Sequence, residues 1–132
     1  MHNIYIAGTG IWYPEEKISN DEIVDSYNSY VKKFNNDNQS DIDNGIIQPM
    51  EFSSAEFIEK ASGIKSRYVI DKEGILDINR MKPRVNNEHP DRLSIHAEVG
   101  VKAALKAMAQ AEVTADEIDA IILGSSHAAR NY

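Results

Sequence analysis

An uninterrupted apolar run near the end of the sequence most constrains the fold of this chain. Residues 118–124 read IDAIILG, and Ile121, Ile122 and Leu123 follow one another without a polar break. A strand with apolar side chains on both faces is typical of the centre of a sheet that is covered on both sides. The run therefore predicts an α/β domain, in which helices pack against a central sheet.

Other segments predict helices and strands in alternation. Residues 3–9 (NIYIAGT) indicate a buried strand, because apolar and polar side chains alternate and β-branched and aromatic types are frequent. Capping-box patterns begin at Ser19, Ser53 and Thr114, where a helix or a helical turn is expected. The expected helices span 19–35, 53–63 and 92–111, and the remaining strands span 67–70 and 118–124. The order β–α–α–β–α–β, without an internal repeat, is that of an α/β domain.

Two stretches predict irregular structure. Residues 35–45 are rich in Asn, Asp and Ser, so we expect an exposed loop or flexible insertion. Residues 71–90 contain the breakers Gly74, Pro83 and Pro90. This second stretch also carries three cations, which are Arg80, Lys82 and Arg84.

Composition excludes several classes of protein. The sequence has no cysteine, which excludes disulfides and thiolate metal sites. A formal net charge of −7 argues against a nucleic-acid partner, which requires a basic face. No apolar run approaches the roughly 18 residues of a membrane span, and the N-terminus does not resemble a signal peptide. We therefore expect a cytoplasmic protein without membrane association. The four histidines, at a spacing that suits no metal site, are His2, His89, His96 and His127.

Four short segments occur in one order along the chain. They are WYPE at 12–15, SNDE at 19–22, FIEKASGIKSR at 57–67 and EIDAIILGS at 117–125. Together they resemble the N-terminal part of a β-ketoacyl-acyl-carrier-protein synthase III, a thiolase-like condensing enzyme. The resemblance leaves out residues 32–50 and 71–91, which look like insertions. The second of these is similar to a longer proteobacterial branch of the family.

The resemblance implies that residues 1–132 are the N-terminal segment of a thiolase-like α/β fold, a mixed sheet with packed helices. It implies decarboxylative Claisen condensation of an acyl-CoA, or another acyl thioester, with malonyl-acyl-carrier protein in fatty-acid or related biosynthesis. These thioesters are substrates, and no cofactor is implied. The resemblance implies that the nucleophile is a cysteine, assisted by a His and by an Asn or a second His. All three are expected beyond Tyr132, so this chain alone is expected to be inactive.

The resemblance also implies a binding role for several residues. Phe57 falls where many relatives place a tryptophan that stacks on the adenine of CoA. Ala61 falls where such relatives have an arginine near the CoA phosphates, so a charge is missing there. The cations Arg80, Lys82 and Arg84 are candidates to replace it, and an exposed, solvated patch is the alternative.

An association into homodimers is implied for the parent enzyme. Tyr132 falls where the family places an aromatic side chain that reaches across the dimer into the partner's acyl pocket. An interface residue that only packs is the alternative at this position.

Two other readings of the whole chain stay open. One is a related thiolase-fold enzyme, such as a hydroxymethylglutaryl-CoA synthase, which shares a similar opening. The other is a non-catalytic partner subunit or a module that binds acyl-carrier protein.

Overall fold

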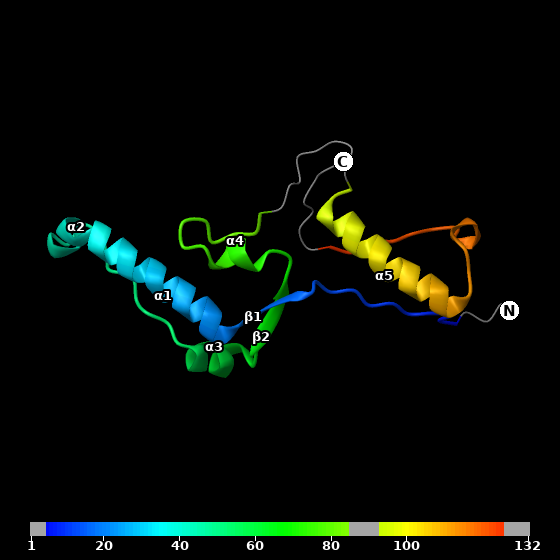
Figure 1. Ribbon diagram of the computed structural model, residues 1–132, viewed down its shortest axis with the longest axis horizontal. Helices are drawn as coiled ribbons and strands as arrows, with labels where there is room; N and C mark the ends of the chain where they lie inside the picture. Colours follow the sequence, from blue (N-terminus) through cyan, green and yellow to red (C-terminus); the bar gives the residue numbers. More distant parts are fainter. Residues whose placement is uncertain (1–4, 85–92, 126–132) are drawn as a thin grey trace. The chain divides into compact units, whose positions relative to one another are not determined.

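The computed structural model describes residues 5–84 and 93–125, and it combines helices with a small sheet (Figure 1). The elements in chain order are β1 (Glu16–Ser19), α1 (Asn20–Asp37), α2 (Gln39–Asp43), α3 (Ala55–Ser62), β2 (Ser66–Val69), α4 (Lys72–Leu76), α5 (Ile95–Ala111) and the 3₁₀ turn η1 (Ala115–Glu117). The chain divides into two compact units. One is Pro14–Arg84, and the other comprises Met1–Tyr13 and Val85–Tyr132.

The sheet of the Pro14–Arg84 unit has two antiparallel strands. β1 pairs with β2 in a register that sets Glu16 opposite Val69 and Ser19 opposite Ser66. Ile18 in β1 is fully buried, so this pair forms one side of the unit's core. The strand expected over 67–70 is confirmed with a shift of one residue, whereas β1 was not expected.

The strands predicted over 3–9 and 118–124 do not form in the described residues, so these predictions are wrong there. Residues 5–9 and 118–124 lie outside any strand, and Ile121 and Ile122 are 84% and 95% exposed. An apolar pattern shows which side chains need cover, but a strand also needs a hydrogen-bonding neighbour. Neither segment finds one within 5–84 and 93–125. The central, doubly covered sheet is therefore replaced there by the β1–β2 pair.

Helix α1 begins where the sequence predicts. The Ser19 hydroxyl accepts a hydrogen bond from the Glu22 amide at 3.2 Å, and the Glu22 carboxylate accepts one from the Ser19 amide at 3.0 Å. This capping box satisfies two backbone donors at the helix start. Val24 and Val31 lie seven positions apart on the buried face. With 18 residues, α1 is one residue longer than α5, which was expected to be the longest helix.

The polar stretch 35–45 is helical, so the expected loop is wrong. α1 continues to Asp37, and α2 follows from Gln39. Local side-chain bonds hold this region, since Asn38 donates to the Phe34 carbonyl at 2.8 Å and Gln39 donates to Asp43 at 2.7 Å. The expected exposure is confirmed, because α2 has no buried residue.

Two asparagines of α1 fasten the segment that follows α2. The Asn35 side chain both donates to the Met50 carbonyl and accepts from the Met50 amide, each at 2.9 Å. Asn28 bonds Ser53 in the same two-way manner, also at 2.9 Å. Each amide side chain acts as a neighbouring strand would, so residues 50–53 are held beside α1.

Helix α3 begins one residue later than the pattern predicts. Ser54 is its N-cap and accepts from the Phe57 amide at 3.1 Å, so no capping box with Glu56 forms. Ser53 is unsuited to the cap because its backbone amide and carbonyl already bond Asn28. The expected end at Gly63 is confirmed: this residue is the C-cap, in the left-handed conformation with a φ of 71°.

Replacing Gly63 with alanine is expected to lower the free energy of unfolding by about 1–2 kcal/mol. A Cβ at this position would meet nothing within 4 Å, so the effect comes from backbone strain alone. Thermal unfolding followed by circular dichroism measures it. Gly124, which also has open space but no positive φ, is the control. Equal stability of the G63A and G124A variants would contradict this account.

A short helix, α4, interrupts a stretch expected to be irregular. Asp71 caps it by accepting a hydrogen bond from the Gly74 amide at 3.2 Å. Two contacts attach α4 to α1: Ser26 donates to the Leu76 carbonyl at 2.8 Å, and Lys72 pairs with Glu22. The prediction is therefore wrong for 72–76, and residues 85–90 lie outside the described residues.

In the other unit, residues 5–13 run alongside α5 (Figure 1, dark blue beside yellow). The Thr9 amide donates to Gln110 at 2.5 Å, and Lys106 donates to the Ile11 carbonyl at 2.9 Å. Gly8 and Gly10 permit this approach, because a Cβ at either would overlap the backbone of α5. The small residues of α5 thus allow close packing against an extended segment.

Helix α5 begins later than the sequence predicts and ends at Ala111, as expected. Ser94 is the N-cap and accepts from the Ala97 amide at 3.3 Å, so the helix begins at Ile95 and not at 92. After α5, η1 forms the single turn predicted from the third capping box. There the Glu117 carboxylate accepts from the Thr114 amide at 2.8 Å.

Candidate functional site

The Pro14–Arg84 unit contains a hollow that we call the α1 cavity. Its volume is about 760 Å³, within the range of small-molecule sites. Its wall is mostly apolar and comes from α1, the segment 51–54, α3, α4 and one residue of the following loop. The lining residues are Ile23, Val24, Ser26, Tyr27, Glu51, Phe52, Ser53, Ser54, Phe57, Ile58, Ile75 and Met81.

The bonds that hold the unit together also shape this cavity. Asn28 places Ser53 in its wall, and Tyr27 donates to the Glu51 carbonyl at 3.2 Å. Ser26 binds the carbonyl of Leu76, the residue after Ile75. α1 is therefore the common support from which the other walls are positioned.

Phe57, the residue expected to stack on a ligand, lies on α3 at the α1 cavity. Its side chain is 66% exposed, so part of the ring remains accessible from solvent. Ala61 lies one turn further along the same helix and is exposed. The structure thus brings Phe57 to a hollow, and the cation of the last turn of α3 is Lys60, the neighbour of Ala61.

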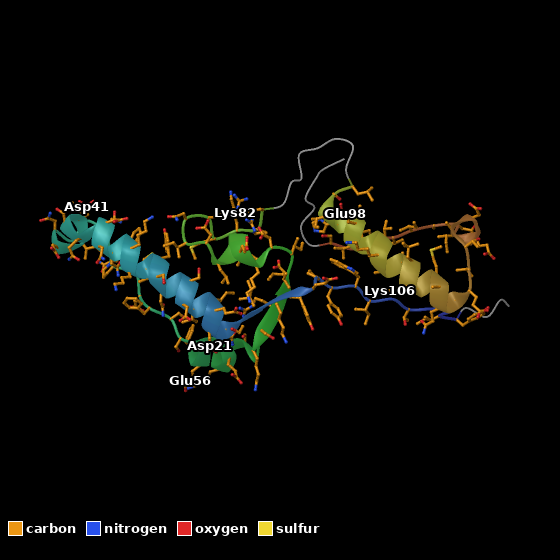
Figure 2. The ribbon with its side chains drawn as sticks, viewed as in Figure 1. Asp21, Asp41, Glu56, Lys82, Glu98 and Lys106 are labelled. Atoms are coloured by element: carbon orange, nitrogen blue, oxygen red, sulfur yellow. The ribbon has the colours of Figure 1, made fainter. Side chains whose placement is uncertain are left out.

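The three predicted cations have different surroundings, and none of them lines the α1 cavity. Lys82 lies on the loop after α4 (Figure 2), and within the described residues its side chain has no hydrogen bond or ion pair. The Arg80 guanidinium donates to the carbonyls of Lys82 and Pro83, at 3.0 and 3.3 Å. Arg84 is already paired with carboxylates.

Arg84 binds two carboxylates at once. Its guanidinium binds Asp71 through two nitrogens, at 2.8 and 2.7 Å, and reaches Glu73 at 2.7 Å. Hydrogen bonds from the Arg84 side chain, and then from its backbone amide, hold the pKa of the Asp71 carboxyl far below its usual range. Asp71 therefore stays charged throughout the ordinary pH range.

This lowered pKa predicts a pH dependence. The Asp71 carboxylate stabilises the fold above its ordinary pKa of about 3.9, and the contribution is lost only as the pH falls through the lower folded-state pKa. In an NMR titration from about pH 5 to about pH 2, we expect the Asp71 side chain to remain largely a carboxylate. The chemical shift of its carboxyl carbon should therefore change little. In the R84Q variant the pKa should rise toward the ordinary value. An unchanged titration in R84Q would contradict the assignment to Arg84.

Two of the four short segments, at 19–22 and 57–67, meet in a cluster of hydrogen bonds. The buried Asn20 side chain donates to the Ile64 carbonyl at 2.6 Å and accepts from Arg67 Nη2 at 3.0 Å. The Asn20 amide also donates to the Lys65 carbonyl at 3.2 Å. This cluster joins the start of α1 to the turn before β2, so the role of these residues is to hold the fold.

Tyr132, His2, His89 and His127 lie outside the described residues. Over 5–84 and 93–125, no group of three or more His, Asp or Glu side chains is arranged to hold a metal ion. In the same ranges, no helix is long and apolar enough to cross a membrane.

Sequence reasoning missed Asp71 and Ile75, the residue of α4 that lines the cavity. Asp71 stands three residues before Gly74 and is of a type favoured at N-caps, which is a usable local signal. Its pairing with Arg84 had no such signal. Ile23 and Tyr27 stand four positions apart in the sequence, which is helical spacing, and both line the cavity.

Over most of its length, this chain is similar to a condensing enzyme of the β-ketoacyl-acyl-carrier-protein synthase class. The relative is a β-ketodecanoyl-(acyl-carrier-protein) synthase of Pseudomonas aeruginosa strain PAO1, which is 41% identical over 109 residues. The match covers 83% of this chain but 31% of the relative, so the chain spans about a third of that protein's length. No protein-family model matches the chain. The similarity confirms the resemblance predicted from the four short segments.

Proposed function

We propose that this chain is part of a thiolase-like β-ketoacyl-acyl-carrier-protein synthase. Such an enzyme condenses an acyl-CoA, or another acyl thioester, with malonyl-acyl-carrier protein in fatty-acid or related biosynthesis. The 41% identity over 109 residues carries the proposal. An acyl-carrier protein as partner, a homodimeric parent and a cytoplasmic location are parts of the same proposal and rest on the resemblance.

The contribution proposed for these 132 residues is binding and not bond formation. The sequence contains no cysteine, which the family uses as the nucleophile. The cysteine would therefore come from outside this sequence, and the resemblance implies the same for the histidine and the asparagine. Binding energy provided here would hold the acyl thioester in place for that chemistry.

The α1 cavity supports a binding role for Phe57 and Lys82. An exposed aromatic face at the edge of an apolar hollow suits an adenine ring or an acyl chain. Lys82 has no partner within the described residues and follows Met81, which lines the cavity. Its ammonium is suited to a phosphate as a mobile point charge. It would supply a positive charge that Ala61 does not.

The name of the relative suggests a probe. A ten-carbon β-ketoacyl product contains two carbons from the malonyl unit, so the acyl group that it extends has eight carbons. We therefore propose octanoyl-CoA as the thioester with which to test binding.

Octanoyl-CoA titrated into the chain in a calorimeter tests this proposal. The F57A variant is expected to bind about tenfold more weakly, because stacking on an aromatic ring contributes about 1–3 kcal/mol. The K82Q variant should lose a few-fold in affinity, and the loss should shrink at high salt. K32Q, which removes an exposed cation of α1 away from the cavity, is the matched control. Equal binding by F57A and the unchanged chain would refute the proposed site.

A further inference from the structure

We propose that Asp71 and Arg84 form a clasp that positions residues 71–84 as a wall of the α1 cavity. Arg84 would then act on a ligand through the position of Met81, as a positioning residue. The inference rests on the proposed function only in treating the cavity as a ligand site. Its first test requires no ligand.

One carboxylate joins the two ends of this loop. Asp71 accepts from the Gly74 amide at the start of α4 and from the Arg84 amide, thirteen positions later, at 2.6 Å. The bidentate contact with the Arg84 guanidinium adds two charge-assisted bonds. The loop is thus closed by backbone and side-chain contacts to the same group.

Contacts inside the loop depend on this closure. The Lys82 amide donates to the Gly74 carbonyl at 3.2 Å, and the Met81 amide donates to the Asp77 carbonyl at 2.8 Å. A Cβ at Gly74 would overlap Asp71 and approach the Lys82 carbonyl, so the two sides of the loop lie directly against each other there. Releasing the Arg84 side chain would remove two of the bonds that keep them together, and the bond from the Arg84 amide to Asp71 would remain.

Met81 is the residue that this closure delivers to the cavity. Its φ of 50° lies in the left-handed region, which is uncommon for a residue other than glycine. Such a conformation persists only when its surroundings impose it. Met81 and Ile75 of α4 are the two residues of 71–84 that line the cavity. The shape of this wall therefore depends on the fold of the loop.

Burial distinguishes the two carboxylates that Arg84 binds. The Asp71 side chain is 13% exposed, whereas that of Glu73 is 80% exposed. Exposed ion pairs contribute little because water and salt screen them. The Asp71 contact should therefore control the loop, and the Glu73 contact should not. This difference provides a matched control, since E73Q removes one of two carboxylates from the same arginine.

Amide hydrogen exchange measured by NMR tests the clasp. In R84Q, the amides of Met81 and Lys82 should exchange at least about tenfold faster, while amides in the middle of α1 keep their rates. E73Q should change the loop rates by less than about twofold. Unchanged loop rates in R84Q overturn the proposal. So does an equal acceleration in α1 and the loop, because it would mean general destabilisation.

A neutral apolar dye, N-phenyl-1-naphthylamine, provides the second readout. It has no phosphate, so its affinity reports on the cavity wall and not on Lys82. We expect R84Q to weaken its binding about fivefold and E73Q to leave it unchanged. Unaltered dye affinity in R84Q, with faster loop exchange, would overturn the step from loop to cavity. Failure of octanoyl-CoA to bind would remove the proposed function and leave the exchange result standing.

Discussion

Replacing Asn20 with alanine is expected to lower the free energy of unfolding of the Pro14–Arg84 unit by about 2–4 kcal/mol. The residue is 4% exposed and bonds both the Ile64 carbonyl and the Arg67 guanidinium. Its removal would leave the Ile64 carbonyl and the partly buried Arg67 guanidinium without these hydrogen bonds. Arg67 Nη1 is already buried without a hydrogen bond in the described structure, so the guanidinium has little capacity to compensate.

Urea denaturation followed by circular dichroism measures this loss. K32A, a substitution at an exposed position of the same helix, should change the stability by less than about 0.5 kcal/mol. A double-mutant cycle with R67A isolates the pair, and we expect a coupling of about 1–2 kcal/mol. Additive effects of N20A and R67A would show that the observed contact contributes nothing specific.

The parts of the fold that the sequence predicted well are those set by neighbouring residues. Ser19 and Glu22 form their capping box three positions apart, and Gly63 ends α3 through its own backbone conformation. The strand at Ser66–Val69 was also recognisable from its composition. For Ser19 and Gly63 the deciding interaction lies within one turn of the chain, whereas β2 also depends on its pairing with the distant strand β1.

The failed predictions depend on distant partners. The run at 118–124 has the composition of a central strand, but no other described segment pairs with it, and Ile122 remains exposed. The polar stretch 35–45 failed for a different reason. Asn and Asp favour loops on average, yet here they supply the side-chain bonds that sustain helical turns, and Asn35 fastens Met50.

The candidate site also contains residues that the sequence identified and contacts that it did not. Phe57 was identified by resemblance, and the structure places it at a cavity that α1 also lines. Arg84 looked equivalent to Lys82 in the sequence. Its pairing with Asp71 depends on a loop closure over thirteen positions, which no local pattern announces. The sequence therefore identified both residues as cations, and only the structure showed that Arg84 is paired with a carboxylate whereas the Lys82 side chain is not, within the described residues.

Replacing Gly10 with alanine is expected to move residues 5–13 away from α5 and to lower the stability of their unit by about 1–3 kcal/mol. The new Cβ would overlap the Ala103 carbonyl and lie 2.6 Å from the Ala107 amide nitrogen. Both are backbone atoms of a regular helix, so they cannot rotate away as a side chain would. The extended segment must move instead, with loss of the bond from Lys106 to the Ile11 carbonyl.

Trp12 reports this movement, because it is the one tryptophan in the sequence and Lys102 lies 4.4 Å from the centre of its ring. Separation from α5 would place the indole in water, so its emission should shift to longer wavelength in G10A. G124A is the control, since a Cβ there would meet nothing within 4 Å. If G10A kept both the emission maximum and the unfolding temperature of the unchanged chain, the close approach at Gly10 would have no energetic role. A shift in G10A alone would show that this glycine is needed because α5 leaves no room for a side chain.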